Sequence, residues 1–223
     1  MILRGLLFAW IAAALAAGFL WAPIVPGLGP TTRVLYFHIP AAWITVVALA
    51  WSMLHSVLYL RRRRMDHDDH AAAAAELGLL FGIVATVSGS MWAKAVWHSY
   101  WNWDPRETSI FFILLIYGAY LALRSAIEGE ERRARLSAIY SAAAFVTVPF
   151  LMFVVPRIYF SLHPDPLINP GGKIEMDPRI RIGFGAMLVG FTGLFAWLLS
   201  LRVRLVRLER VQLEAGAVPG GSL

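Results

Sequence analysis

The sequence predicts an all-α integral membrane bundle of six transmembrane helices. Three observations lead there: a mean hydropathy of +0.63, a charged fraction of only 15%, and six apolar runs separated by short polar segments. Soluble chains carry about 25% charged residues, and a membrane-spanning helix needs about 20 mainly apolar ones. We therefore expect one membrane domain over residues 1–223 and exclude a soluble enzyme or a nucleic-acid-binding protein.

Charged or turn-forming residues bound each apolar run. In chain order the runs cover residues 5–21, 40–60, 77–96, 109–123, 136–155 and 181–201. The fourth run reaches spanning length if it begins at Pro105 and continues to Ile127. The first has some features of a cleavable signal peptide, but its apolar residues continue past the small-residue site, which favours a retained helix.

Local signals support several of these helices. Asp104-Pro105 and Asp177-Pro178 each place an N-cap acceptor before a proline suited to the first helical position, and Glu107 completes a capping box. Pro149 lacks a backbone donor and predicts a kink in the fifth helix. Four glycines between residues 183 and 193 indicate close packing of the sixth.

The basic residues predict the orientation. Counted on alternate sides, thirteen Lys and Arg residues fall on the side of the termini and seven on the other. Cytoplasmic segments carry the positive excess, so both termini are predicted to lie in the cytoplasm. The outward loops are then 22–39, 97–104 and 156–180, the inward connectors 61–76 and 124–135, and the cytoplasmic tail 202–223.

Some chemistry is excluded by composition. The chain has no cysteine, so it has neither disulfides nor thiolate metal sites. It also lacks the Gly-x-x-x-x-Gly-Lys-Ser/Thr sequence of a phosphate-binding loop. Its net charge of +6 comes from short basic clusters between apolar runs, which favours contact with membrane lipid over nucleic acid.

The histidines on the inward side are weaker candidates for a metal or ligand site. The stretch 66–70, Asp-His-Asp-Asp-His, has residue types that bind divalent metals, but without a rigid scaffold a solvated turn is the favoured interpretation. His55 lies within the second span, about 25 Å along a helix from His38. A neutral His55, hydrogen-bonded to a neighbouring helix, is expected.

The second outward loop is rich in aromatic residues. Trp97, Trp101, Trp103 and a tyrosine put four rings within seven residues. Two interpretations remain open at this point. The rings form either an interfacial belt followed by a helix cap at Asp104, or a surface on which a planar ligand stacks, with Arg106 pairing an anionic substituent.

Two outward histidines support the interpretation of the loop as a binding surface for a planar ligand. His38 stands at the outer end of the second span and His163 in the third outward loop. Either one alone is most simply an amphipathic boundary residue. Together, on the same side as the tryptophans, they have the residue type and setting to supply both axial nitrogens of a haem iron.

These segments resemble a known family. The stretch ending Trp101-Asn102-Trp103-Asp104 is similar to the tryptophan-rich signature of the haem-handling proteins of cytochrome c maturation. The segment 36–43, Tyr-Phe-His-Ile-Pro-Ala-Ala-Trp, looks like the one that carries the first outward histidine of the CcmC branch. The resemblance covers nearly the whole chain. One departure is His98, where the family commonly has glycine after the first tryptophan.

The resemblance implies a multi-pass subunit of the bacterial inner membrane. It would bind non-covalent haem b, act with the partner subunits CcmA, CcmB and CcmD of an ATP-driven complex, and transfer haem to the chaperone CcmE. The implied axial ligands are His38 and His163, and the implied haem-holding residues are Trp97, Trp101, Trp103 and Asp104.

Two alternatives are kept. Residues 104–107, Asp-Pro-Arg-Glu, also look like the related CcsA-type synthases, which implies a lyase that joins haem to apocytochrome. A membrane b-type cytochrome is the other, although its paired histidines usually lie inside the spans.

Overall fold

The computed structural model describes residues 2–163 and 176–216, and every regular element in that part of the chain is helical. Within it, six helical segments are long and apolar enough to cross a membrane, which confirms the predicted six-span fold. These segments are Ile2–Trp21, Gly29–Arg62, Met65–Trp97, Pro105–Ala126, Glu130–Ile158 and Pro178–Arg210.

Several spans combine more than one kind of helix. The first comprises α1 (Ile2–Ala16) and the π-helical turn η1 (Ala17–Trp21), and the second the 3-10 turn η2 (Gly29–Val34) and α2 (Leu35–Arg62). The third and fourth are α3 (Met65–Trp97) and α4 (Pro105–Ala126). The fifth comprises α5 (Glu130–Phe145), α6 (Thr147–Pro149), the π-helical η3 (Phe150–Val154) and α7 (Val155–Ile158), and the sixth is α8 (Pro178–Gly216).

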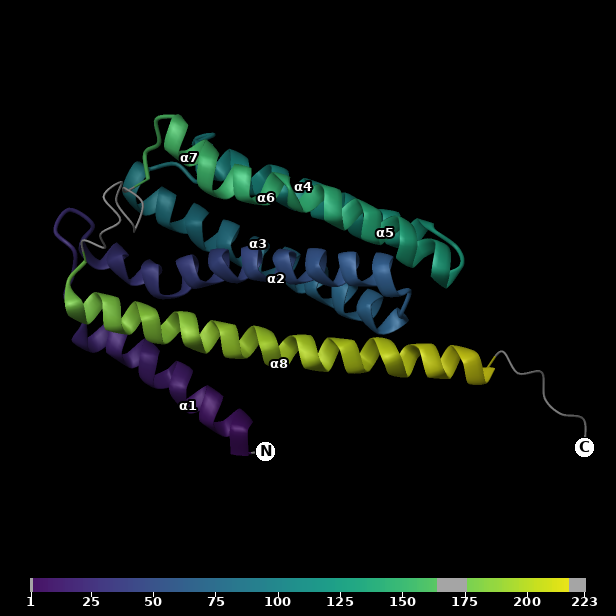
Figure 1. Cartoon of the computed structure of the whole chain (residues 1–223). Helices are drawn as coiled ribbons and strands as arrows, with labels where there is room; N and C mark the ends of the chain where they lie inside the picture. The colour runs from purple at the N-terminus through teal and green to yellow at the C-terminus, as the bar shows by residue number, and fades with distance from the viewer. Residues whose placement is uncertain (1, 164–175, 217–223) are drawn as a thin grey trace, which may run out of the picture.

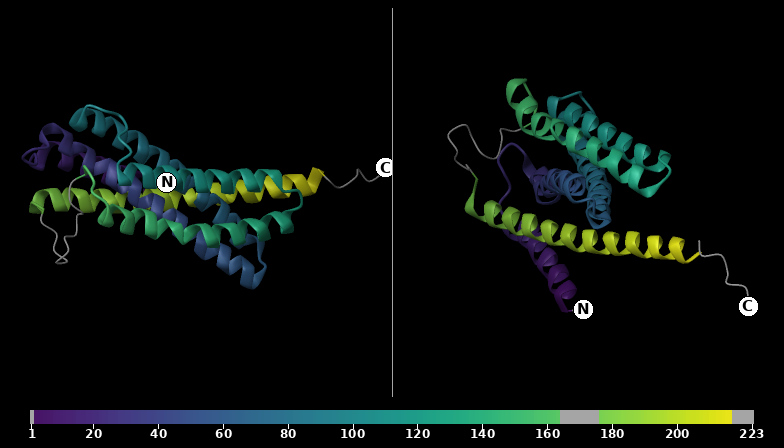
Figure 2. Two further views of the ribbon diagram at one scale, coloured as in Figure 1. Left: turned by 90° about the horizontal axis from the view of Figure 1, so that it is seen from above. Right: turned by 45° about the vertical axis from the view of Figure 1, so that its right-hand side comes forward.

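The spans form three layers (Figures 1 and 2). The antiparallel pair α2–α3 lies in the middle and packs on one side against α4 and the fifth span. On the other side it packs against α8, and α1 contacts α8 at the edge of the bundle. The end that holds the α3–α4 loop is named the outer end, following the predicted orientation, and the opposite end the inner end.

Small residues let the helices approach closely. A Cβ at Gly78 of α3 would lie 2.6 Å from Leu49 of α2, and one at Gly190 of α8 would lie 2.9 Å from Ile11 of α1. Such contacts between small and large side chains are typical of membrane helix packing. Of the four glycines predicted to pack closely in the sixth span, only Gly185 has open space around it.

The inward connectors 61–76 and 124–135 are mostly helical; residues 61–64 and most of 124–135 are exposed, as expected of solvated connectors, whereas much of 68–75 is buried. Of 61–76 only the two residues 63–64 are non-helical, and of 124–135 only 127–129. The acidic side chains of α3 are buried because basic residues from other helices pair with them: Arg124 contacts Asp68 at 2.7 and 2.9 Å, and Arg210 contacts Asp69. Likewise the predicted tail 202–223 continues as α8 to Gly216.

The predicted solvated turn at 66–70 is likewise part of α3. Its His67 lies with Nδ1 3.3 Å from Nδ1 of His55, which confirms that His55 is hydrogen-bonded to a neighbouring helix. At the outer end, α2 begins at Leu35, so His38 lies in its first turn instead of in the predicted loop 22–39. The third outward loop, 156–180, lies partly outside the described residues.

Pro149 interrupts the fifth span as predicted. α5 ends at Phe145, the residue whose carbonyl a donor at position 149 would have bonded. The chain continues through α6 into the π-helical turn η3. α5 packs against both α2 and α4, α6 packs against α2, and η3 and α7 pack against α4.

Candidate functional site

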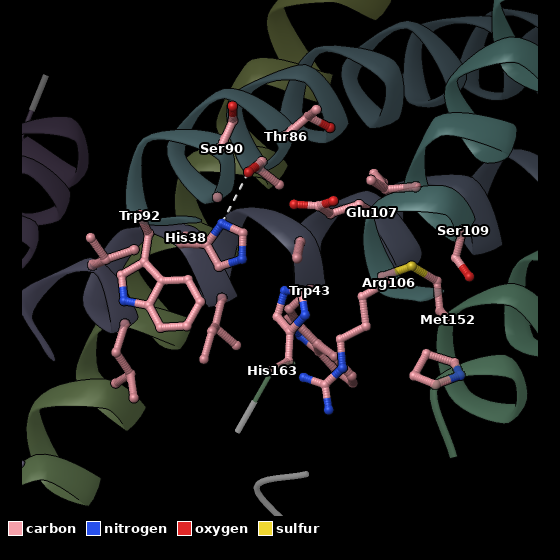
Figure 3. Close-up of a pocket in the computed structure, with 18 of the residues that line it drawn as sticks. His38, Trp43, Thr86, Ser90, Trp92, Arg106, Glu107, Ser109, Met152 and His163 are labelled. Atoms are coloured by element: carbon pink, nitrogen blue, oxygen red, sulfur yellow. Dashed lines mark hydrogen bonds between the residues drawn. The ribbon is translucent and has the colours of Figure 1, made fainter. Parts of the chain in front are cut away.

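A cavity of about 490 Å³ opens at the outer end of the bundle (Figure 3). Its walls come from η2 and α2, α3, the start of α4, η3 and α7, and the segment that follows α7. Both predicted histidines, His38 and His163, line it, as do Trp101 and Arg106. Most of the remaining lining is apolar, including Trp43 and other residues that recur every three or four positions on one face of α2.

His38 is held by α3. Its Nδ1 lies 3.0 Å from the carbonyl oxygen of Ala85 and 3.1 Å from Oγ of Ser88. A carbonyl only accepts, so Nδ1 carries the proton and donates it, and Nε2 keeps its lone pair. The ring fits because residue 89 is glycine, where a Cβ would lie 2.7 Å from Cε1 of His38.

His163 is held by a carboxylate. Its Nδ1 lies 2.8 Å from Oδ1 of Asp104. Burial, together with the nearby charge of Arg106, lowers the pKa of His163 to about 4 even though Asp104 acts in the opposite direction. The imidazole is therefore neutral at pH 7, donates through Nδ1 and keeps its lone pair on Nε2.

Asp104 joins two parts of the outer end. It caps α4 by accepting from the backbone N–H of Arg106 at 2.9 Å, and Glu107 completes the predicted capping box. It also accepts from the N–H of Leu162 at 2.7 Å and from Oγ of Ser161. Burial would raise the pKa of this carboxyl, but these hydrogen bonds lower it overall, so Asp104 stays ionised. Asp104 therefore fixes His163 to the start of α4.

The three predicted tryptophans occupy different positions. Trp101 lines the cavity. Trp97 packs edge-to-face against His163, with ring centroids 4.8 Å apart, and against Trp92. Trp103 packs edge-to-face against Trp101 but is 65% exposed. The rings do not form one flat surface, so a planar ligand would contact Trp101 and not all three.

Two residues of this loop have an unusual backbone. His98, the C-cap of α3, has φ of 61°, and Trp103 has φ of 58°. Both lie in the left-handed region that favours glycine. Glycine would adopt this conformation at position 98 without strain, and the hydrogen bond from Lys94 Nζ to the His98 carbonyl helps to hold the turn.

Several lining residues were missed by sequence reasoning. Arg157 adds a second cation beside Arg106, while Trp92 and Met152 extend the wall. Met152 comes from the π-helical turn, and Figure 3 shows its sulfur at the cavity. The spacing of lining residues on α2 was a usable signal, whereas nothing in the sequence indicated that Arg157 would reach this site.

Comparisons with known proteins identify the family. The family model for CcmC, described as "Heme exporter protein C", matches residues 1–216. "Heme exporter protein C" of Rhodobacter capsulatus is 29% identical over 214 residues, covering 90% of this chain and 86% of the relative. That of Bradyrhizobium diazoefficiens is 30% identical, covering 85% and 74%, and that of Escherichia coli K12 is 28% identical, covering 87% and 81%. The chain belongs to the CcmC family of heme exporter proteins.

Proposed function

We propose that this protein holds non-covalent haem b in the outer cavity, between His38 and His163, and passes it to the haem chaperone CcmE. Family membership and six apolar spans make the chain a multi-pass inner-membrane protein with a role in haem handling for cytochrome c maturation. The ligand set, the form of haem and the recipient are the parts that we propose.

The two imidazoles are the observation that carries the proposal. His38 and His163 line one cavity, and each has Nδ1 bound to an acceptor and a lone pair on Nε2. Metal-ligating histidines ordinarily use this arrangement, in which the acceptor on the other nitrogen fixes the tautomer and raises ligand basicity. Haem iron can be held by two protein ligands, and the Nε2 atoms of these two neutral imidazoles would supply both.

The rest of the lining suits the remainder of a haem molecule. Apolar side chains and Trp43, Trp92 and Trp101 offer contact to the porphyrin ring. Arg106 and Arg157 are positioned to pair with its two propionates, and Arg–carboxylate contacts are strong when partly shielded from water. Bound haem supplies the iron chemistry; the protein's own residues orient it and limit access of water.

Transfer is assigned to the exposed side of the same loop. Trp101 lies at the cavity and Trp103, its edge-to-face neighbour, is exposed at the outer end, so one loop contacts both the ligand and a docked protein. The chain has no phosphate-binding loop, and we assign ATP hydrolysis to the partner subunits CcmA and CcmB, with CcmD completing the complex.

Absorption spectroscopy of the purified full-length protein tests the ligand set. We expect a Soret band and the spectrum of a six-coordinate, bis-imidazole iron, which His38→Ala and His163→Ala each change. His98→Asn is the control, because Asn tolerates the left-handed conformation and His98 does not line the cavity. The ligand set is refuted if His163→Ala keeps the parent's spectrum.

A transfer assay separates this function from its alternative. Loaded protein is mixed with either the chaperone CcmE or an apocytochrome peptide containing Cys-x-x-Cys-His. Haem delivered to the chaperone supports the proposal. Haem joined to the peptide thiols, without the chaperone, would instead identify a CcsA-like lyase.

A further inference from the structure

A second group of histidines lies at the inner end of the bundle. His55 of α2 stacks on His70 of α3, with ring centroids 4.7 Å apart and planes inclined by 16°. His67 contacts the same ring, with centroids 5.3 Å apart. Seventeen residues of helix, about 25 Å, separate His55 from His38. The three rings therefore take no part in the outer cavity.

The hydrogen bonds leave ligand nitrogens available in this group. Nδ1 of His70 lies 2.8 Å from the carbonyl oxygen of Asp66, so it must donate and Nε2 keeps a lone pair. Nδ1 of His55 and of His67 lie 3.3 Å apart, so one donates to the other. The donor ring then has its lone pair on Nε2. At least two of the three Nε2 atoms are therefore unprotonated.

The setting is apolar and aromatic on one side and basic on the other. The ring of Trp51, one helical turn from His55, lies 5.1 Å from that imidazole and is 39% exposed. Leu54, three residues further along α2, is 45% exposed and lies in a segment long and apolar enough to span a membrane. The exposed arginines 61–64 lie at the adjacent α2–α3 turn. Asp66 of α3, whose backbone carbonyl accepts from His70, has its carboxylate paired with Arg64 and Arg207.

The geometry selects the class of ligand. Among the described residues, no three His, Cys, Asp or Glu side chains converge in a way that could hold a metal ion. A bare transition-metal ion, which needs three or four protein ligands, is therefore disfavoured. Haem iron already carries four porphyrin nitrogens and needs only one or two imidazoles. The indole and leucine surface suits the ring, and the arginines suit its carboxylates.

We infer that His55, His67 and His70 form a second iron-porphyrin site at the inner end. The identity of the ligand rests on the proposed function. The porphyrin would contact Trp51 and Leu54 with lipid on its other face, and its iron would be held by Nε2 of His55 or of His70, because Nε2 of His67 is buried.

Titration with hemin in an outer-site variant tests the inner site. His38→Ala/His163→Ala removes the outer ligands, and we expect it still to bind hemin with an imidazole-ligated spectrum. Adding His55→Ala and His70→Ala should weaken that residual binding at least tenfold, whereas adding His98→Asn should leave it unchanged. Residual binding that is the same with and without the inner histidines would overturn the inference.

The two proposals fail in different ways. If His38→Ala/His163→Ala binds hemin as the parent does, the outer assignment is wrong whatever the inner histidines do.

A second measurement uses the unmodified protein, so it does not depend on whether the variants fold. Two equivalents of hemin should protect His55 and His70 from diethyl pyrocarbonate while His98 stays reactive; modification of His55 and His70 at the rate of hemin-free protein refutes the inner site.

Discussion

Replacing Gly89 with alanine tests whether the position of His38 determines haem binding. The new Cβ would lie 2.7 Å from Cε1 of His38 and 3.3 Å from Nδ1, so the ring must move by about 0.7 Å to reach ordinary contact at 3.4 Å. That movement breaks or stretches the bonds from Nδ1 to Ala85 and Ser88. A hydrogen bond is worth about 0.5–1.5 kcal/mol net, and misplacement of the ligand adds to this loss, so we expect about tenfold weaker hemin binding.

The same change should not unfold the protein. Alanine is favoured over glycine inside a helix by about 0.5–1 kcal/mol, which offsets much of the loss of the His38 hydrogen bonds, so thermal stability without haem should change little. Hemin titration and the absorption spectrum are the measurements. Gly118→Ala is the matched control, because a Cβ at Gly118 meets nothing within 4 Å. Parental affinity and an unchanged spectrum in Gly89→Ala would refute the account of how His38 is positioned.

Four further predictions concern other parts of the structure. Asp104→Asn should keep the helix cap but lower hemin affinity about 10–100-fold in titrations, because the ligand imidazole loses its anionic partner. Trp101→Ala should speed haem loss to a scavenger protein, whereas exposed Trp103→Ala should slow only transfer to the chaperone. In chemical unfolding, Asp68→Asn should cost about 3–5 kcal/mol by breaking a buried ion pair, and Asp66→Asn under about 1, because its pair is exposed. A reporter that is active only outside the cytoplasm should be silent at the α2–α3 turn, because that turn carries the positive excess.

The sequence predicted the number of spans well and their ends poorly. Apolar runs locate the part of a helix that lies in lipid, but helices continue wherever their polar residues find partners. α3 begins at Met65, twelve residues before the apolar run, because Asp68 and Asp69 pair with arginines of α4 and α8. Those partners are more than fifty residues away in the chain, so local pattern could not reveal them.

The sequence predicted which residues lie at the site but not how each of them is held in place. His38, His163 and Trp101 do line one cavity, but their outward location alone could not show how each is held. Asp104 was expected as a helix cap, and its bond to His163 depends on the fold of residues 159–163 against the start of α4. Gly89 gave no signal, because a glycine needed for a neighbour's ring looks like any other glycine in an apolar run.

The interruption of the fifth span at Pro149 contributes to the shape of the cavity. Beyond α6 the fifth span continues through η3, which packs against α4, and Leu151, Met152 and Phe153 of that turn line the cavity. Pro156 then prevents a second regular bond, to the carbonyl of Met152. The π-helical turn between the two prolines thus contributes one wall of the cavity that His38 and His163 also line.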